Sequence, residues 1–178
     1  MVSIRKTKIV LDSDVIIHFS KGECFHVLLD IFPEYEYIIL DIVYDELRKH
    51  PQTKLMIDRA EKWFSNKLSI HPFSPKEGST KDYALLRKTC GVGEAACMIY
   101  CRDNNDVLGS SNLKDIQIFC DRYSITYLTT LDFLYYAYIR GKMNRETCNE
   151  FMKKVKENGS ILPDYITDIA HYKCGVAI

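Results

Sequence analysis

Short apolar runs alternate with segments of helical spacing along this chain, and the alternation limits the folds that it can adopt. Runs of this kind are typical of parallel strands, which are buried on both faces. The predicted strands are residues 7–11, 37–40, 68–73, 106–109 and 125–128. A chain that returns to the sheet through helices builds a mostly parallel sheet covered on both faces. The sequence therefore predicts an α/β fold.

The segments between these strands have the spacing and the capping residues of helices. The predicted helices are residues 13–20, 23–32, 41–50, 52–66, 81–88, 94–102, 112–123, 131–140 and 144–159. A chain of 178 residues, 47% of them hydrophobic, is long enough for one domain with a proper core. We assign residues 1–160 to that domain. Residues 161–178 are expected to form a C-terminal tail that packs on the domain or extends from it.

Composition argues against several classes of protein. The formal net charge is +0, so overall charge favours no particular partner. The seven cysteines are odd in number and form no Cys-x-x-Cys pair, which argues against a disulfide framework and a zinc ribbon. Reduced thiols suit the cytoplasm. No segment looks like a signal peptide or a bilayer span, so we expect a cytoplasmic protein without a membrane partner.

Two acidic residues follow the first predicted strand directly. Asp12 and Asp14 flank Ser13 in the segment KIVLDSDVIIHF, residues 8–19. Open α/β sheets place their chemistry at the carboxyl ends of the strands, so acids at this point are candidates for an active site. Asp12 or Ser13 would equally serve as the cap of the next helix, and for each acid alone this simpler interpretation stays open.

Three further acids occupy comparable positions beside apolar segments. Glu46 lies in VYDEL, Glu94 in GVGEAA and Asp115 in SSNLKDI. Carboxylates gathered at one edge would repel each other, and a divalent cation removes that repulsion. Mg²⁺ and Mn²⁺ prefer oxygen ligands and lower the pKa of a bound water, which suits hydrolysis of a phosphodiester. We therefore predict that these acids and Asp12 share a cation; the alternative is a set of independent surface acids.

These motifs resemble those of the PIN-domain ribonucleases, and among them the toxins of VapC-type toxin–antitoxin pairs. The resemblance covers about residues 7–158 and rests on VLDSDVII, VYDEL, GVGEAA, SSNLKDI and ITYLTTLDFLYYAYIRGKM. It implies a three-layer α/β/α, PIN-like fold, one or two Mg²⁺ or Mn²⁺ ions, and hydrolysis of RNA. It also implies a homodimer and an antitoxin whose peptide lies over the active site.

The resemblance also implies roles for individual residues. Asp12, Glu46 and Glu94 are expected to be catalytic and to hold the metal directly or through water. Asp115 would complete the set or orient a water. Polar neighbours would hydrogen-bond the ligands or a phosphate, and these are Ser13, Asp14, Ser110 and Asn112.

The chain departs from the family's pattern in two places. In some relatives the fourth motif reads roughly Thr-x-Asn-x-x-Asp-Phe, and here Ile116 replaces the phenylalanine. Other relatives carry a pair of aspartates, and in this chain Ser111 and Asn112 occupy those positions. Asp14 adds an acid where the family usually carries a neutral asparagine. The altered fourth motif leaves open a PIN-like RNA- or protein-binding module with weakened or lost nuclease activity. A flap-type DNA nuclease is a further alternative, since related folds act on DNA.

Substrate contacts are predicted less sharply than the acids. Basic residues near the expected edge are candidates for phosphate contacts, and they are Lys21, Arg48, Lys49, Lys114 and Arg140. His18 is expected to pack in the interior. The tyrosines of residues 131–140 stand among apolar neighbours, which favours core or dimer packing over base stacking.

Overall fold

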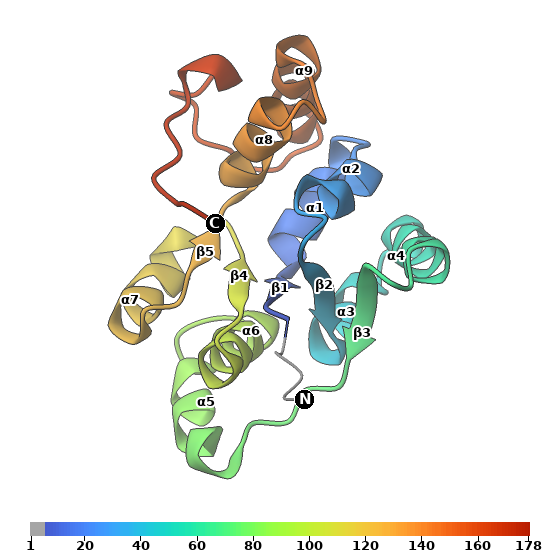
Figure 1. The fold of residues 1–178 in the computed structure, drawn as a ribbon. Helices are drawn as coiled ribbons and strands as arrows, with labels where there is room; N and C mark the ends of the chain where they lie inside the picture. The colour runs from blue at the N-terminus through green and yellow to red at the C-terminus, as the bar shows by residue number, and fades with distance from the viewer. Residues whose placement is uncertain (1–5) are drawn as a thin grey trace, which may run out of the picture.

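The computed structural model describes residues 6–178, which form one parallel sheet between two layers of helices (Figure 1). The strands are β1 (Lys8–Leu11), β2 (Glu36–Leu40), β3 (Leu68–His71), β4 (Val107–Gly109) and β5 (Tyr127–Leu128). Their order in the sheet is β3-β2-β1-β4-β5, and every adjacent pair is parallel. The predicted α/β class and the three-layer α/β/α arrangement are confirmed.

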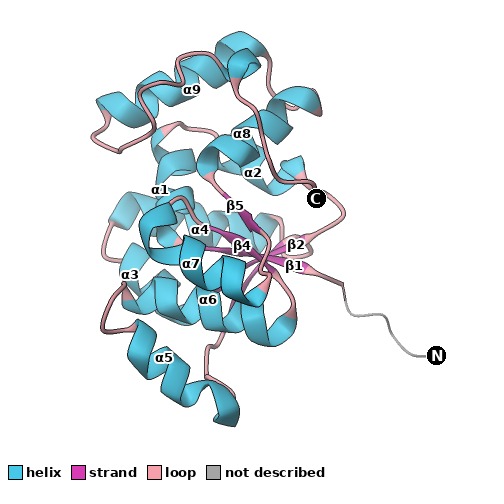
Figure 2. Cartoon of the chain, turned by 90° about the vertical axis from the view of Figure 1, so that its left-hand side faces the viewer, coloured by secondary structure: helices cyan, strands magenta, loops and turns pink. Residues whose placement is uncertain are grey.

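The helices divide between the two faces of the sheet (Figure 2). One face is covered by α1 (Ser13–Lys21), α2 (Phe25–Ile31), α8 (Thr130–Ile139) and α9 (Arg145–Glu157). The other face is covered by α6 (Val92–Asn104), which contacts α3 (Asp41–Leu47), α5 (Thr80–Leu86) and α7 (Leu113–Tyr123). The edge strand β3 is flanked by α4 (Pro51–Trp63). Within residues 6–178 we find no helix with the length and apolar character that a bilayer span requires.

Most element boundaries lie within about two residues of the sequence prediction, and the larger differences are at the ends of elements; the helix predicted over residues 41–50, for example, ends at Leu47. The helix predicted to reach residue 66 ends at Trp63, and β5 is shorter than predicted. The strand predicted to reach residue 73 stops at His71, because the next residue is a proline and cannot donate a ladder hydrogen bond. Leu40 is the N-cap residue of α3, and Asp41 lies in the first helical turn.

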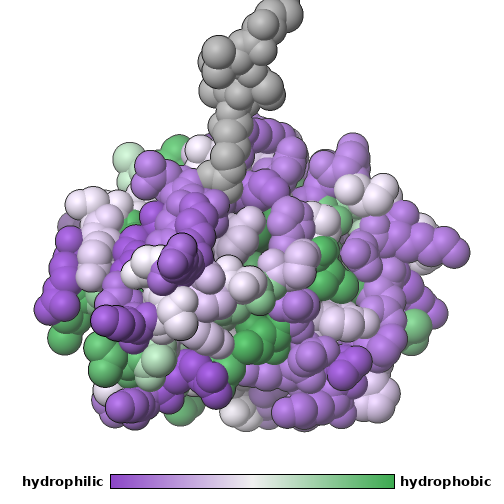
Figure 3. All heavy atoms as spheres, turned by 90° about the horizontal axis from the view of Figure 1, so that it is seen from below, coloured by the Kyte–Doolittle hydropathy of each residue, from purple (hydrophilic) through white to green (hydrophobic). Residues whose placement is uncertain are grey.

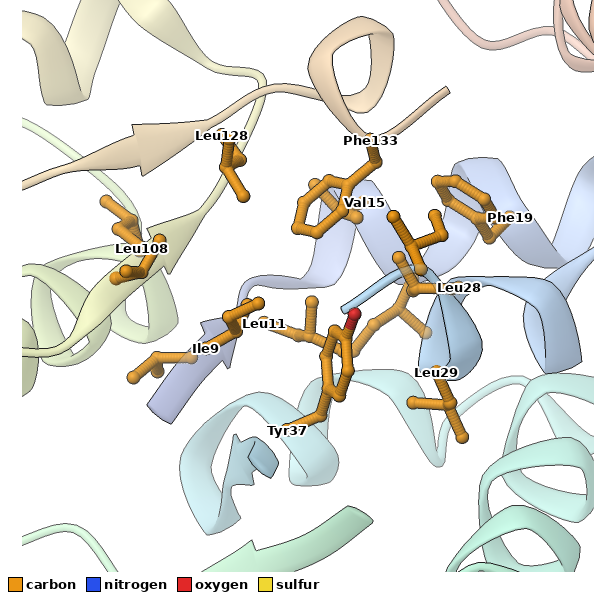
Figure 4. Packing of buried hydrophobic residues seen from close by; sticks show 14 of the residues in the cluster. Ile9, Leu11, Val15, Phe19, Leu28, Leu29, Tyr37, Leu108, Leu128 and Phe133 are labelled. Atoms are coloured by element: carbon orange, nitrogen blue, oxygen red, sulfur yellow. The ribbon is translucent and has the colours of Figure 1, made fainter. Parts of the chain in front are cut away.

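The central strand β1 is enclosed on both faces. Ile9, Val10 and Leu11 have no exposed surface. Figure 4 shows the side chains of Ile9 and Leu11 among those of neighbouring elements, including Tyr37 of β2 and Phe133 of α8. The side-chain hydroxyl of Tyr37 has a hydrogen-bond partner, because it accepts the backbone N–H of Phe32 at 3.2 Å. This packing fixes the position at which the chain leaves β1, and the acids follow directly.

Gly22 ends α1 against an aromatic ring of α9. A Cβ atom on Gly22 would lie 2.2 Å from Cδ2 of Phe151. That ring is buried and packs on Phe19 with 4.9 Å between ring centroids, so it has no room to move. We expect Gly22→Ala to lower the free energy of unfolding by about 1–3 kcal/mol in urea denaturation. Gly78→Ala is the control, since a Cβ there meets nothing within 4 Å, and equal destabilisation by both would contradict this explanation.

Residues 161–178 pack on the domain and do not extend from it. Their buried apolar side chains are Leu162, Ile166 and Ile169. Polar groups also attach the tail to α8, because the Tyr172 hydroxyl and the Cys174 thiol both donate to Oδ1 of Asp132, at 2.7 and 3.2 Å. The other carboxylate oxygen of Asp132 closes a capping box with Thr129 at the start of α8. The tail therefore secures the first turn of that helix.

Candidate active site

Asp12 lies at the carboxyl end of β1, where the chain turns into α1. Its backbone N–H donates to the carbonyl of Gly109 at 2.8 Å, which joins the ends of β1 and β4. Its carboxylate caps α1 by accepting the N–H of the next residue at 2.8 Å. The residue is only 4% exposed. Burial, followed by the charge of Asp14 and then those of Glu94 and Glu46, raises the pKa of Asp12 well above its ordinary value.

Asp14 organises the loop that follows β4. Its carboxylate accepts the N–H groups of Val15 and Ser111, each at 2.6 Å, and the Ser110 hydroxyl at 3.5 Å. Burial raises the pKa of Asp14, and these hydrogen bonds oppose the rise. Asp14 therefore has two effects: it places a second negative charge beside Asp12 and it fixes the loop after β4.

Glu46 of α3 is held by the start of α6. Its Oε1 accepts the backbone N–H of Gly93 at 3.2 Å. The two helices approach so closely that a Cβ on Gly93 would lie 3.1 Å from both Glu46 Oε1 and Val43 Cγ2. The first turn of α6 also favours a nearby carboxylate, because the partial positive charge of the helix lies at that end. The second glycine of the GVG motif therefore leaves little room for a side chain between α3 and α6.

Glu94 lies in the first turn of α6 and is 7% exposed. Burial, followed by the charges of Asp115 and Asp14, raises its pKa to about 7. Asn112 opposes this rise as a hydrogen-bond donor, and its amide also donates to Oδ2 of Asp115 at 2.8 Å. Asn112 therefore stands between the carboxylates of α6 and α7.

The structure brings the predicted acids to one edge of the sheet. The pKa of Asp12 responds to Asp14, Glu94 and Glu46, and that of Glu94 responds to Asp115. Among the residues that the structure describes, none of these five acids forms a salt bridge. Buried negative charge without a partner is costly unless protons or a cation neutralise it.

The donor set suits a hard divalent cation in chemistry and in charge. All of its ligand atoms are carboxylate oxygens, which Mg²⁺ and Mn²⁺ prefer. As the side chains stand, no three carboxylate, thiol or imidazole groups within the described part of the chain converge closely enough to hold a metal ion. Binding would therefore require rotation of Asp12, Glu46 or Glu94, or bridging waters, which Mg²⁺ commonly retains.

A series of hydrogen bonds that was not predicted from the sequence links Asp14, through Ser111, to α8. The Ser111 hydroxyl accepts the N–H of Thr130 and lies 2.8 Å from Thr130 Oγ1. Thr130 Oγ1 lies in turn 2.8 Å from Nδ1 of His18. Burial, and to a lesser degree Lys21, lowers the pKa of His18 to about 4, so this ring is neutral near neutral pH. These hydrogen bonds connect the loop after β4 to α8. Thr130 lies within one of the quoted motifs, but the sequence pattern assigned it no role.

Most of the predicted basic contacts are engaged in other interactions. Arg140 donates to Glu34 at 2.8 Å and to the carbonyl of Ile31, just before β2, so it lies at the opposite edge of the sheet from the acids. Lys21 donates to a serine hydroxyl of the loop after α9, Arg48 pairs with Asp45, and Lys49 is exposed. Lys114 is next to Asp115 and forms no salt bridge with any described residue.

No protein-family model matches this chain, and no curated protein is significantly similar to it. The relationship to the PIN-domain ribonucleases therefore stays a prediction that rests on the motifs.

The contact between Gly93 and Glu46 gives a prediction about the site. We expect Gly93→Ala to push the Glu46 carboxylate aside and to weaken Mn²⁺ binding, measured by calorimetry, about tenfold or more. Its effect on unfolding should be small, because alanine is the better helix former. Gly91→Ala is the matched control, since the nearest atom to a Cβ there is 3.9 Å away. Equal affinities in the two variants would show that the close approach does not position Glu46.

Proposed function

We propose that this protein is a metal-dependent endoribonuclease that hydrolyses RNA phosphodiester bonds with Mg²⁺ or Mn²⁺. The observation that carries this proposal is the group of buried, unpaired carboxylates at the carboxyl edge of the sheet, centred on Asp12 and Glu94. A bound divalent cation supplies a water of lowered pKa and offsets the charge that develops on the phosphate. Parallel α/β sheets commonly place their sites at this edge.

The chain's own residues have distinct tasks in this proposal. Asp12, Glu46 and Glu94 hold the cation, and Asp115 joins them or orients a water. Asp14 replaces the charge that the fourth motif has lost, because its carboxylate lies on the loop in which Ser111 stands at an acidic position. The remaining polar neighbours bind ligands or the scissile phosphate, and these are Ser13, Ser110 and Asn112.

A second candidate function is a module that binds RNA or protein without efficient cleavage. Two observations favour it: the altered fourth motif, and the side-chain positions, in which no three ligand groups within residues 6–178 converge. In that case the carboxylates would stay partly protonated and no tight cation site would form.

One set of assays separates these functions. Single-stranded RNA and structured DNA are incubated with the protein in Mg²⁺, in Mn²⁺ and in EDTA. The ribonuclease proposal expects RNA to be cut with either cation and to survive in EDTA. Binding of RNA without metal-dependent turnover would support the binding module, and preferential cutting of structured DNA would support a flap-type nuclease.

The proposal extends to partners and location. We infer a homodimer and a small antitoxin protein from the motifs, and copurification with the product of the adjacent upstream gene tests the second of these. The seven cysteines are free thiols, four of them buried, which supports a reducing compartment such as the cytoplasm.

A further inference from the structure

A groove between α5 and α7 starts at the candidate active site. Its inner part is a hollow of about 290 Å³ that has Asp115 in its wall, together with Lys114, Ile118, Phe119 and Arg122. A second hollow, of about 360 Å³, continues along the same two helices and shares Phe119 and Arg122 with the first. The two hollows form one path, which we call the α5–α7 groove, from the carboxylates to the outer end of α7.

The cations of the α5–α7 groove have no acidic partners. Lys88, Lys114 and Arg122 form no salt bridge with any residue that the structure describes. Arg102, whose guanidinium lies over the rings of Phe119 and Tyr123, differs in this respect, because it pairs with Asp82 at 2.6 Å. The three unpaired cations therefore leave an attractive surface for phosphates beside an acidic centre.

The wall of the groove also presents aromatic and apolar surface. The rings of Phe119 and Tyr123 lie 4.6 Å apart between centroids, and the Arg102 guanidinium supports both of them at 5.7 and 5.0 Å. Ile118 is 73% exposed, and Leu85 is 60% exposed. Figure 3, which shows the molecule from below, has apolar patches within a largely polar face. Aromatic faces of this kind stack with unpaired bases.

We propose that the α5–α7 groove binds single-stranded nucleic acid next to the bond that is cut. Lys114 and Arg122 contact phosphates, and the pair of Phe119 and Tyr123 carries a base. A single strand fits this surface because its bases are free to stack on side chains, whereas those of a duplex are not. The statement that a bond is cut next to the groove rests on the proposed nuclease function. The binding of single-stranded nucleic acid in the groove does not.

A second copy of the chain is the main competitor for this surface. The exposed apolar residues would suit it, but the charges argue against it. A two-fold interface places each patch against its own copy, so the unpaired cations of one protomer would approach those of the other. Like charges that face each other across an interface are unfavourable. Phosphates remove this problem, and the charge pattern therefore favours nucleic acid.

The test compares two double variants that each remove one lysine and one arginine. Lys114→Ala with Arg122→Ala removes two of the three unpaired cations of the groove, and Arg59→Ala with Lys62→Ala removes the same charge from exposed positions on α4. Binding of a fluorescent single-stranded RNA of about 12 nucleotides is followed by anisotropy in EDTA, so that no cleavage interferes. We expect the groove variant to bind about tenfold more weakly, with a salt dependence reduced by about 1.4 in log–log slope. We expect the α4 variant to bind like wild type.

Three results would overturn the proposal. The first is an equal loss of binding in both double variants, which would indicate a general charge effect. The second is no loss in the groove variant. The third is an Ile118→Asp variant that converts a dimer to a monomer in light scattering while RNA binding stays at the wild-type level, which would assign the groove to a second copy. The nuclease function fails separately, if RNA survives in Mg²⁺ and Mn²⁺ although the groove binds it.

Discussion

Replacing Asp12 with asparagine is expected to lower the rate of RNA cleavage more than about 100-fold and to stabilise the cation-free protein. The rate falls because a neutral amide is a poorer ligand for a hard cation than a carboxylate. Stability rises because Asp12 is buried beside Asp14 and Glu94, and the change removes one of the repelling charges. Asparagine caps helices as well as aspartate does, so the N–H of Ser13 keeps its partner.

Cleavage rates and urea unfolding of the same preparations check both parts of this expectation. Asp45→Asn is the control, because that side chain is 59% exposed on α3 beside Arg48, and removing its charge should change neither quantity. Cleavage by Asp12→Asn at the wild-type rate would remove Asp12 from the proposed nuclease site. A loss of stability in EDTA would show that the carboxylates do not repel one another as described.

Glu94 is expected to make folding stability depend strongly on pH. The folded protein keeps a proton on Glu94 up to about pH 7, whereas in the unfolded chain the ordinary pKa is 4.5. The contribution of Glu94 to stability is therefore fully present below about pH 4.5 and is lost as the pH rises through 7, by up to about 3 kcal/mol. Glu94→Gln has no proton to lose and should escape this loss.

The buried His18 changes stability in the opposite sense. Its pKa of about 4 in the folded protein lies below the ordinary 6.5, so stability is gained as the pH rises through this interval. Because His18 is present in both proteins, its effect cancels when their free energies of unfolding are compared. We therefore predict the difference in the free energy of unfolding between wild type and Glu94→Gln, measured by urea denaturation in EDTA. This difference should grow in favour of the variant between pH 4.5 and about 8. A difference that stays constant over this range would contradict the raised pKa.

Stabilisation by divalent cations gives a second comparison between wild type and Glu94→Gln. Mg²⁺ or Mn²⁺ should stabilise wild type at about pH 8 and much less at about pH 5, because a proton on Glu94 competes with the cation. The stabilisation should be weaker in Glu94→Gln. Equal stabilisation of both proteins at both pH values would mean that the cation binds elsewhere.

The fold could be predicted from the sequence because its elements are encoded locally. Buried strands such as Ile9–Leu11 are apolar without interruption, and the helices between them have apolar residues at regular spacing. The placement of Asp12, Glu46 and Glu94 at one edge of the sheet follows from topology, because the carboxyl ends of parallel strands share that edge. Neither inference requires knowledge of side-chain packing.

Other parts of the site could not be predicted because they depend on contacts between distant segments. The tight fit at Gly93 arises from the distance between α3 and α6, and the position of Thr130 from the packing of α8 on α1. The α5–α7 groove is formed by two helices that are separated in the sequence by α6 and β4. No local sequence pattern predicts a space between α5 and α7. The role of Asp14 in fixing Ser111 is equally non-local.

The last residues of the chain stand at the far end of a series of contacts that reaches the carboxylates. Tyr172 and Cys174 donate hydrogen bonds to Asp132 in the first turn of α8. In the same turn, the N–H of Thr130 donates to the Ser111 hydroxyl, and the N–H of Ser111 donates to Asp14. Trimming the protein at residue 160 would remove both of these hydrogen bonds to Asp132. If the proposed ribonuclease function holds, a version shortened in this way is expected to cut RNA more slowly, although the alteration lies outside every motif described above.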